Sequence, residues 1–420
     1  LVNRSIQFLS DGKSNDPDKP FFLYLAFGAG HWPHHAPREY IEKYNGSFDQ
    51  GWDAVRNETL ARQKALGVVP EDTVLPPRDP YVKAWDSLSE EEKKVYSRLA
   101  EVHAAYVDYT DEQIGRFMDY LNESGLAENT MIVVISDNGA SPEGDADGYS
   151  NMLLWSNGLS QGGESSGFQQ DFMAVPGSNI STMLAQIDEL GGPRSYPTYP
   201  LGWAMADNTP NRLYKWTSHE GGTHDPLIVY WPAGIKDKGG VRGQFCHVID
   251  ILPTVLEVLG LEAPEVYHGV PQRPVEGTSI AYTFNSSDVP TRKSVQYFEM
   301  MGTRALWYDN WKAVAFHHLA SGGNFDQDIW ELYNLSADVS ESRDLAAEHP
   351  EKLKEMQERW WAEAGKYNVL PLDDRAGARY ASIQKTGTFS YTYKPGVEKI
   401  MEPDICNTRI RCSTITAYAD

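Results

Sequence analysis

The sequence is poor in cysteine, in positive charge and in long apolar runs. Three cysteines among 420 residues are too few for a disulfide scaffold. The 37 basic residues are outnumbered by 59 acidic ones, and a net charge of −22 argues against binding to nucleic acid or to an anionic membrane surface. No apolar run approaches the roughly 20 residues that a membrane-spanning helix needs. We therefore expect neither a nucleic-acid partner nor a membrane partner.

The sequence also lacks an initiator methionine, and its first residues, LVNRSIQFLS, lack the basic and apolar regions of a signal peptide. This start favours a processed chain or an incomplete sequence. The apolar content of 41% is typical of a globular protein, and the length is sufficient for one large domain and a smaller one.

Asn-x-Ser/Thr sequons are unusually frequent in the sequence. Seven occur where chance would give about two or three, which predicts a eukaryotic glycoprotein that is secreted or lysosomal, with chance sequons in a cytosolic protein as the alternative. Cys406 and Cys412 are close enough in sequence for a disulfide, whereas Cys246 is either a buried free thiol or the partner of a cysteine outside this chain. The sequons lie at Asn3, Asn45, Asn57, Asn122, Asn179, Asn285 and Asn334.

Strand and helix patterns alternate over the first 290 residues. A capping box at Ser89 and Glu92 predicts the start of a long helix that stops near Gly125, and residues 250–260 predict another helix. Residues 142–210 are rich in Gly, Ser and Pro, which is typical of a functional segment or of a cover over a site. The alternation favours an α/β sheet with helices on both faces. The predicted strands are PFFLYLAF at 20–27, MIVVIS at 131–136 and DPLIVYW at 225–231.

The pattern changes near residue 290. Four short strand candidates, SVQYFEM, TRALWYD, WKAVAF and DIWELYNL, precede a helix predicted at 350–364. Such an order predicts a small antiparallel sheet covered by one helix. We therefore predict an α/β domain over residues 1–290, a small α+β domain over 291–366 and an extended tail over 367–420.

Asp137 and Asn138 directly follow the predicted strand MIVVI, at the end of a strand where open α/β sheets bind ligands. Carboxylate and amide oxygens suit Ca²⁺ or Mg²⁺, although Asp-Asn-Gly is also an ordinary turn sequence. Two ligands cannot hold a divalent ion, so other carboxylates would have to complete such a site.

His31 and Lys215 lie in two further loops that border predicted strands. His31, in HWPHH, is either an acid or base or a hydrogen-bonded structural residue. Lys215, in NRLYKWTSHEGGTHDP, is either a surface lysine or, beside a metal, a clamp for a tetrahedral oxyanion. The glycines of HEGG would leave room for the backbone to approach a ligand closely.

Together, and in this order, these segments resemble the sulfatase family, specifically the arylsulfatases of the alkaline-phosphatase-like superfamily. The resemblance extends from residue 20 to about 370 and implies a large mixed sheet with helices on both faces plus the small C-terminal domain. The segments that carry it are GAGHWPHHAPREYIEKY, VISDNGAS, NRLYKWTSHEGGTHDPLIVYWP, HVIDILPTVLEVLG, RALWYDNWKAV and WELYNLSADVSESRDLAAEHPEKL.

The resemblance also implies roles for individual residues. Asp137 and Asn138 match the second half of the family's Ca²⁺ site, with Mg²⁺ the less favoured ion. Lys215 matches the lysine that contacts the sulfate, and His31 matches the histidine that contacts it and can protonate the leaving oxygen. One departure is His224, in GGTHDP, where many members have Arg.

A second departure concerns the nucleophile. The family uses a formylglycine made from Cys or Ser in a C/S-x-P-x-R motif, and no Cys or Ser of this chain lies in such a motif. The resemblance implies that the formylglycine and two more metal-binding aspartates lie in an N-terminal companion chain or portion. We expect hydrolysis of sulfate esters on a small molecule or glycan. The alternatives are a phosphatase or phosphodiesterase of the same superfamily and a non-catalytic sulfatase-like glycoprotein.

Overall fold

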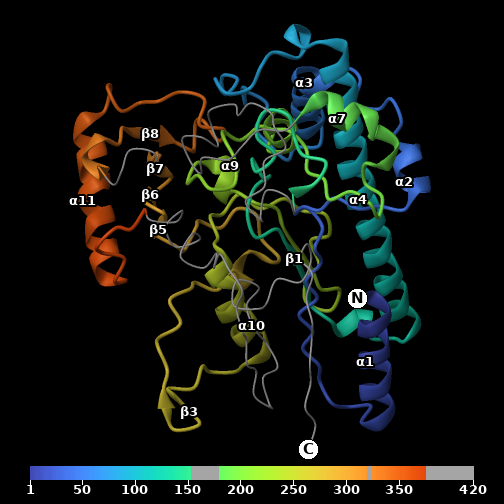
Figure 1. Ribbon diagram of the computed structural model, residues 1–420. Helices are drawn as coiled ribbons and strands as arrows, with labels where there is room; N and C mark the ends of the chain where they lie inside the picture. Colours follow the sequence, from blue (N-terminus) through green and yellow to red (C-terminus); the bar gives the residue numbers. More distant parts are fainter. Residues whose placement is uncertain (153–178, 319–323, 375–420) are drawn as a thin grey trace, which may run out of the picture.

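The computed structural model describes residues 1–152, 179–318 and 324–374, and the account below concerns these ranges (Figure 1). It has a mixed α/β architecture that ends in an antiparallel sheet. No helix in these ranges is both long and apolar enough to span a membrane. The helices are α1 (Val2–Asn15), α2 (Arg38–Lys43), α3 (Gly51–Ala65), α4 (Glu90–Glu123), α7 (Ile180–Ala185), α8 (Leu201–Asp207), α9 (Glu220–Thr223), α10 (Ile251–Leu259) and α11 (Pro350–Lys366). The strands are β1 (Ile132–Ile135), β2 (Leu227–Tyr230), β3 (Val266–Tyr267), β4 (Val270–Pro271), β5 (Val295–Met300), β6 (Thr303–Tyr308), β7 (Trp311–Ala315) and β8 (Trp330–Asn334).

Helix α4 begins at the capping box that the sequence predicts. The hydroxyl of Ser89 accepts a hydrogen bond from the backbone N–H of Glu92 at 3.2 Å, and the Glu92 carboxylate accepts one from the N–H of Ser89 at 2.7 Å. Because the first N–H groups of a helix have no partner within it, the two bonds fix the start of α4. The helix ends at Glu123, and its C-cap Ser124 is followed directly by Gly125, which has a positive φ of 71°, so the predicted stop is confirmed as well.

Replacing Ser89 with alanine is expected to lower the free energy of unfolding by about 1 kcal/mol, because the N–H of Glu92 loses its acceptor. Urea denaturation followed by circular dichroism measures this change. Ser10→Ala, at an exposed position of α1, is the matched control and should change stability by less than about 0.5 kcal/mol. An equal effect of both substitutions would contradict a role for the cap.

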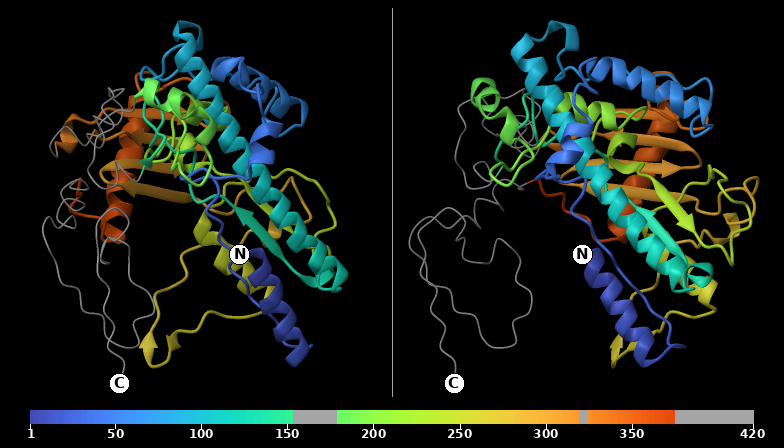
Figure 2. Two further views of the ribbon diagram at one scale, coloured as in Figure 1. Left: turned by 45° about the vertical axis from the view of Figure 1, so that its right-hand side comes forward. Right: turned by 90° about the vertical axis from the view of Figure 1, so that its right-hand side faces the viewer.

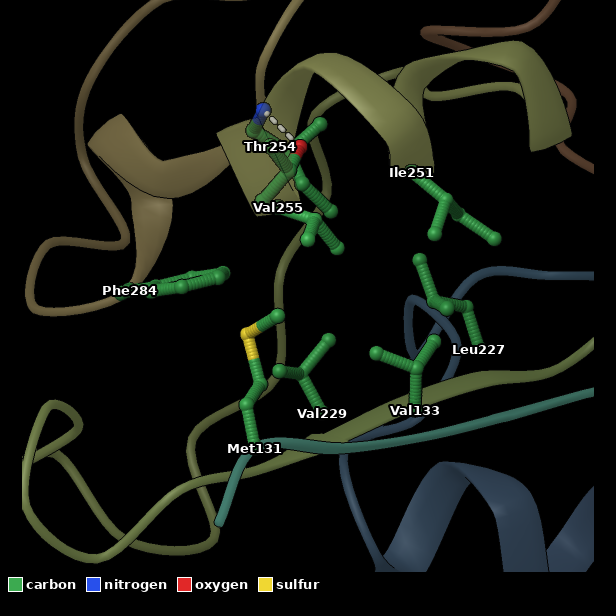
Figure 3. A pocket seen from close by; sticks show the side chains of 9 residues that line it. Met131, Val133, Leu227, Val229, Ile251, Thr254, Val255 and Phe284 are labelled. Carbon is green, nitrogen blue, oxygen red and sulfur yellow. Dashed lines mark hydrogen bonds between the residues drawn. The ribbon is translucent and has the colours of Figure 1, made fainter. Parts of the chain in front are cut away.

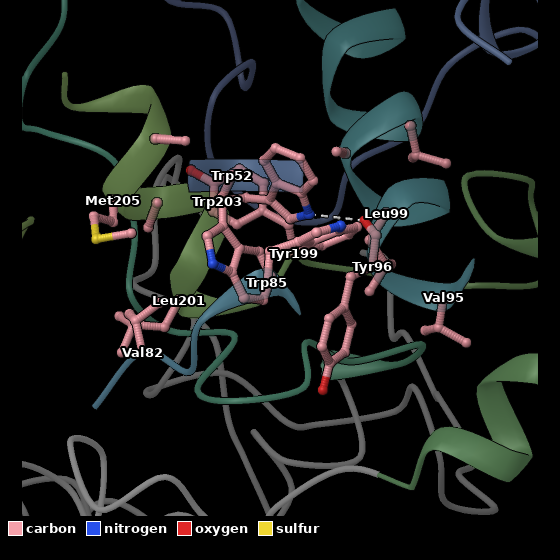
Figure 4. Close-up of a cluster of buried hydrophobic side chains, with 14 of the residues drawn as sticks. Trp52, Val82, Trp85, Val95, Tyr96, Leu99, Tyr199, Leu201, Trp203 and Met205 are labelled. Carbon is pink, nitrogen blue, oxygen red and sulfur yellow. Dashed lines mark hydrogen bonds between the residues drawn. The ribbon is translucent and has the colours of Figure 1, made fainter. Parts of the chain in front are cut away.

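The largest hydrophobic core lies where α3 and α8 pack against α4, and aromatic rings fill it (Figure 4). Trp52 lies 4.8 Å from Trp85 and 5.7 Å from Trp203 between ring centroids, in edge-to-face arrangements. The indole N–H of Trp203 donates to the backbone carbonyl of Tyr96 on α4 at 2.8 Å, so its one polar atom is satisfied.

Strands β1 and β2 form an antiparallel pair in which Ile132 faces Tyr230 and Ile135 faces Leu227. Helices lie on both faces of the pair, as predicted. Ile132 packs in the cluster that α1 and α4 form on one face. On the other face, a shallow apolar pocket, partly open to solvent, lies between the sheet and α10 (Figure 3). Its walls include Met131, Val133, Leu227 and Val229 from the sheet side, and Ile251 and Val255 from α10.

The segment 20–27 is extended but is not a strand, so the sequence prediction is wrong at this point. Its backbone makes no hydrogen bond within the described ranges, although its side chains alternate in burial as those of a strand do. Phe22 and Tyr24 are each 81% exposed. A strand requires a hydrogen-bonded neighbour, and none lies beside this segment in those ranges. Among the described residues up to 290, β1 pairs only with β2, so the expected large mixed sheet is represented there by these two strands.

The C-terminal sheet and its covering helix are confirmed. Strands β5, β6, β7 and β8 pair in this order and antiparallel throughout, and α11 lies across one face of the sheet (Figures 1 and 2). Trp360 of α11 is fully buried against the sheet, and its indole N–H donates to the carbonyl of Phe298 at 3.0 Å. These elements fall within the predicted domain 291–366, whereas residues 375–420 of the predicted tail lie outside the described residues.

Candidate functional site

Two loops meet at the end of the β1–β2 pair, one after β1 and one before β2. A Cβ atom at Gly139 would lie 1.7 Å from the carbonyl oxygen of Gly221, so only glycine permits this approach. The backbone N–H of Lys215 donates to the carbonyl of Ala140 at 3.1 Å. A Cβ atom at Gly221 would lie 2.2 Å from the carbonyl oxygen of Leu213, and one at Gly222 would lie 2.1 Å from that of Thr217. The protein's own backbone thus fills the space beside the HEGG glycines, and the prediction that it is left for a ligand is wrong.

Asn208, at the end of α8, joins the same two loops through its side-chain amide. The oxygen accepts from the N–H of Ala140 at 2.8 Å, and the nitrogen donates to the carbonyl of Leu213 at 2.8 Å. Leu213 and Trp216, on either side of Lys215, both have positive φ angles, of 62° and 79°. Bulky residues rarely adopt this conformation, and such strain persists where the surrounding structure fixes it, often at functional sites.

Glu143 brings the two predicted catalytic residues together. Its carboxylate oxygen Oε1 lies 3.2 Å from the Lys215 ammonium, and Oε2 lies 3.5 Å from His31 Nε2. Two indoles also donate to it: Trp216 Nε1 to Oε1 at 3.2 Å, and Trp32 Nε1 to Oε2. The Glu143 side chain is 8% exposed. Burial alone would raise its pKa, but Lys215 and His31 more than offset this effect and hold the pKa of Glu143 below its usual value.

The orientation of His31 follows from its second ring nitrogen. Nδ1 lies 2.8 Å from the backbone carbonyl of Trp32, and because a carbonyl only accepts, Nδ1 carries a proton. Nε2, which faces Glu143, then carries a proton only in the charged imidazolium form. The side chain is 48% exposed, so it lies at the solvent side of the cluster formed by His31, Trp32, Glu143, Lys215 and Trp216.

Asp137 and Asn138 lie on the loop after β1. The amide nitrogen of Asn138 donates to the carbonyl of Gly139 at 3.0 Å, which leaves the amide oxygen as the atom available for a cation. The pKa of Asp225 is raised to about 7, chiefly by burial; His224 lowers it, and the nearby carboxylates of Asp137 and Glu220 raise it. No hydrogen bond or ion pair within the described ranges joins Asp137 or Asn138 to His31 or Lys215.

The donor atoms of Asp137 and Asn138 fit Ca²⁺, which takes carboxylate and amide oxygens. Across residues 1–152, 179–318 and 324–374, however, no group of three or more His, Cys, Asp or Glu side chains could hold a metal ion. These residues therefore fit part of a cation site, and further ligands would have to complete it.

The C-terminal sheet holds the Lys215 loop in place through Glu331 of β8. His219 Nε2 lies 2.6 Å from the Glu331 carboxylate, and Arg212 donates to it at 2.9 Å. The hydroxyl of Tyr333 donates to the same carboxylate at 2.9 Å. Burial alone would raise the pKa of Glu331, but these partners, His219 first, lower it to about 2.

Lys312, Glu220 and Glu341 form a second set of ion pairs, the Lys312 clamp, which is almost fully buried and joins β7 to α9. The ammonium of Lys312 lies 2.5 Å from Glu220 and 3.3 Å from Glu341, and the backbone N–H of Glu220 donates to Glu341 at 2.7 Å. Burial would raise the pKa of Glu220, but Lys312 and His224 lower it to about 2. His224, the departure from the family pattern, pairs with Glu220 at 2.7 Å.

Sequence reasoning missed Glu143, Lys312, Glu331 and Glu341. Glu143 lies in the segment that was predicted to be functional or to cover a site, and this was the one signal that could have pointed to it. The other three lie in the predicted small domain 291–366, to which the sequence analysis assigns no site residue.

The remaining predicted residues are placed as follows. Cys246 is a free, partly buried thiol whose pKa is raised by burial, whereas Cys406 and Cys412 lie outside the described residues. Asn179 and Asn334 are partly buried, and the Asn179 side chain accepts from the N–H of Thr182 at the start of α7. The predicted glycosylation of all seven stays a prediction. The exposed sequon residues are Asn3, Asn45, Asn57, Asn122 and Asn285.

Comparison with known proteins gives consistent matches. The sulfatase family model matches residues 1–261. An uncharacterised sulfatase of Schizosaccharomyces pombe is 33% identical over 371 residues, which cover 86% of this chain and 61% of that protein. An arylsulfatase of Klebsiella aerogenes is 30% identical over 273 residues, which cover 64% of this chain and 52% of the enzyme. The crystal structure of Ps i-CgsB matches with a TM-score of 0.49 and 17% identity, covering 89% of this chain and 55% of that one. The chain thus spans roughly half to three fifths of each of these proteins.

Proposed function

The chain belongs to the sulfatase family, and we propose that it supplies the sulfate-binding residues and part of the metal site of an enzyme that hydrolyses sulfate esters. One observation carries the proposal for the site: Lys215 and His31, from loops far apart in sequence, converge on a single buried carboxylate. Such a cluster of positive and donor groups is what a bound anion requires.

Each of the two residues has a distinct task in this proposal. The Lys215 ammonium offsets the negative charge on the sulfate oxygens as the ester bond breaks. The imidazolium of His31 donates its Nε2 proton to the leaving oxygen, and its exposed position would let a substrate approach from solvent. The Asp137 carboxylate and the Asn138 amide oxygen would hold Ca²⁺, which supplies further positive charge to the sulfate when bound.

We further propose that the formylglycine and the remaining metal ligands belong to a companion N-terminal portion that packs against this chain. The extended segment 20–27 supports this proposal, because its backbone is unpaired in the described structure and Phe22 and Tyr24 are exposed. An open strand-like edge with apolar side chains is normally covered in a folded protein. Ile228 of β2 is also exposed, at 59%.

The substrate class that we propose is a sulfated small molecule or glycan. The seven sequons support a secreted or lysosomal glycoprotein as the setting. Ca²⁺ is favoured over Mg²⁺ by the resemblance to the arylsulfatases.

The test is to purify the native assembly that contains this chain and to compare hydrolysis of 4-nitrophenyl sulfate and 4-nitrophenyl phosphate. We expect release of nitrophenolate predominantly from the sulfate ester. Preference for the phosphate ester would favour a phosphatase or phosphodiesterase. Binding of sulfated glycans without release of sulfate would favour the non-catalytic alternative. A mass spectrum that contains only this chain and its glycans would contradict the companion portion.

A further inference from the structure

We propose that the Glu143 carboxylate occupies the anion position of the site, and that the indole N–H groups of Trp32 and Trp216 join Lys215 and His31 in binding the sulfate group that displaces it. The proposal rests on the proposed function and adds two binding residues and a resident competitor to it. Nothing in the sequence motifs assigns a role to Glu143, Trp32 or Trp216.

The arrangement of donors around Glu143 is that of an anion-binding site. Four donor groups from two short segments, 31–32 and 215–216, point at one carboxylate. Oε1 accepts from Lys215 and Trp216, and Oε2 accepts from Trp32 and lies 3.5 Å from His31 Nε2. The oxygens of a sulfate group are acceptors only, like those of a carboxylate, so the same four donors can serve either anion.

Replacing the Glu143 carboxylate with a sulfate monoester does not change the net charge of the site. A sulfate monoester carries one negative charge, as the ionised Glu143 side chain does, and the indoles are neutral donors. Replacing one by the other therefore leaves the net charge beside Lys215 unchanged. The loss of the ion pair between Lys215 and Glu143 is compensated by the new pair between Lys215 and the sulfate.

The surroundings of Glu143 favour movement of its side chain over movement of its backbone. A Cβ atom at the next residue, Gly144, would lie 1.7 Å from the carbonyl of Tyr199, so the backbone is tightly packed there. The N–H of Glu143 itself donates to the Ser141 hydroxyl at 3.3 Å. The carboxylate can leave towards His31, the exposed member of the cluster, where water solvates its charge.

The experiment titrates the full chain with methyl sulfate, a singly charged sulfate ester, by isothermal calorimetry. Glu143→Gln keeps the shape of the side chain and removes the competing charge. We expect it to bind methyl sulfate at least about tenfold more tightly than the wild type, a difference of about 1.4 kcal/mol. Glu91→Gln is the matched control, because Glu91 is exposed on α4 and the substitution changes the net charge equally. It should leave the affinity unchanged.

A second substitution tests the indoles. In the Glu143→Gln background, Trp216→Phe removes one N–H donor and keeps an aromatic ring, and it should lower the affinity several-fold. Glu143→Asp, which draws the carboxylate away from the donors, should also increase the affinity and serves if Glu143→Gln does not fold. Unchanged, weaker or undetectable binding in folded Glu143 variants would overturn the proposal and make Glu143 a structural ion-pair partner. Calorimetry involves no turnover, so a failure to hydrolyse sulfate esters would count against the proposed function alone.

Discussion

Replacing Lys215 with alanine is expected to lower kcat for 4-nitrophenyl sulfate by about 100- to 1,000-fold in the native assembly, the range found when one stabilising donor is removed from an anionic transition state. The ammonium is held at the site by the bond from its own backbone N–H to Ala140 and by the strained residues on either side. Its charge is therefore in place before the substrate arrives. Initial rates at saturating substrate measure the change, and Lys238→Ala, at an exposed position, should leave them unaltered.

Whether Lys215→Ala changes kcat or KM shows which role Lys215 has. A rise in KM with unchanged kcat would mean that Lys215 binds ground state and transition state equally, which would contradict its role in the chemical step. The double variant Lys215→Ala, Glu143→Gln removes the carboxylate that the single variant leaves without its ammonium. We expect the double variant to remain slow. Recovery of wild-type rates would mean that Lys215 serves only to neutralise Glu143.

Elements that depend on local sequence patterns could be predicted. The structure confirms three such elements: the capping box at Ser89, strand β1 in the apolar run 131–136, and the four strands after residue 290. Segment 20–27 shows the limit of such reasoning. Its alternation of exposed and partly buried side chains is that of a strand, but strand formation depends on a neighbour that the sequence of the segment does not specify.

Some residues of the candidate site could likewise be predicted from the sequence, and others could not. His31 and Lys215 could be identified because each lies in a recognisable motif beside a predicted strand. Glu143 could not, because it meets Lys215 across 72 positions of sequence and nothing local distinguishes it from the other acidic residues. Lys312 and Glu331 could not be identified for another reason. The pattern of a strand does not indicate which of its charged side chains contact a distant loop. Both are contributed by the C-terminal sheet to the Lys215 loop, so the predicted small domain supports the site directly.

Replacing Lys312 with methionine is expected to lower the free energy of unfolding by about 3–5 kcal/mol, the usual cost of removing one partner from a buried ion pair. Lys312 and Glu341 are fully buried, and Glu220 is nearly so, which means that water cannot solvate the carboxylates once the ammonium is absent. Burial alone would lower the pKa of Lys312, but Glu220 and Glu341 raise it, so the group is charged in the folded protein. Urea denaturation measures the loss, with Lys354→Met at an exposed position of α11 as the control.

The triple variant Lys312→Met, Glu220→Gln, Glu341→Gln separates buried charge from lost packing. Because no unpaired charge remains in it, we expect it to regain at least half of the stability that Lys312→Met loses. If Lys312→Met lowers the free energy of unfolding by less than about 1 kcal/mol, water reaches the carboxylates and the network contributes no more than a surface ion pair.

Glu220 begins α9 directly after the Lys215 loop, so Lys312→Met should also weaken binding of methyl sulfate. Full stability loss with unchanged methyl sulfate affinity would show that the clamp supports the fold without positioning Lys215.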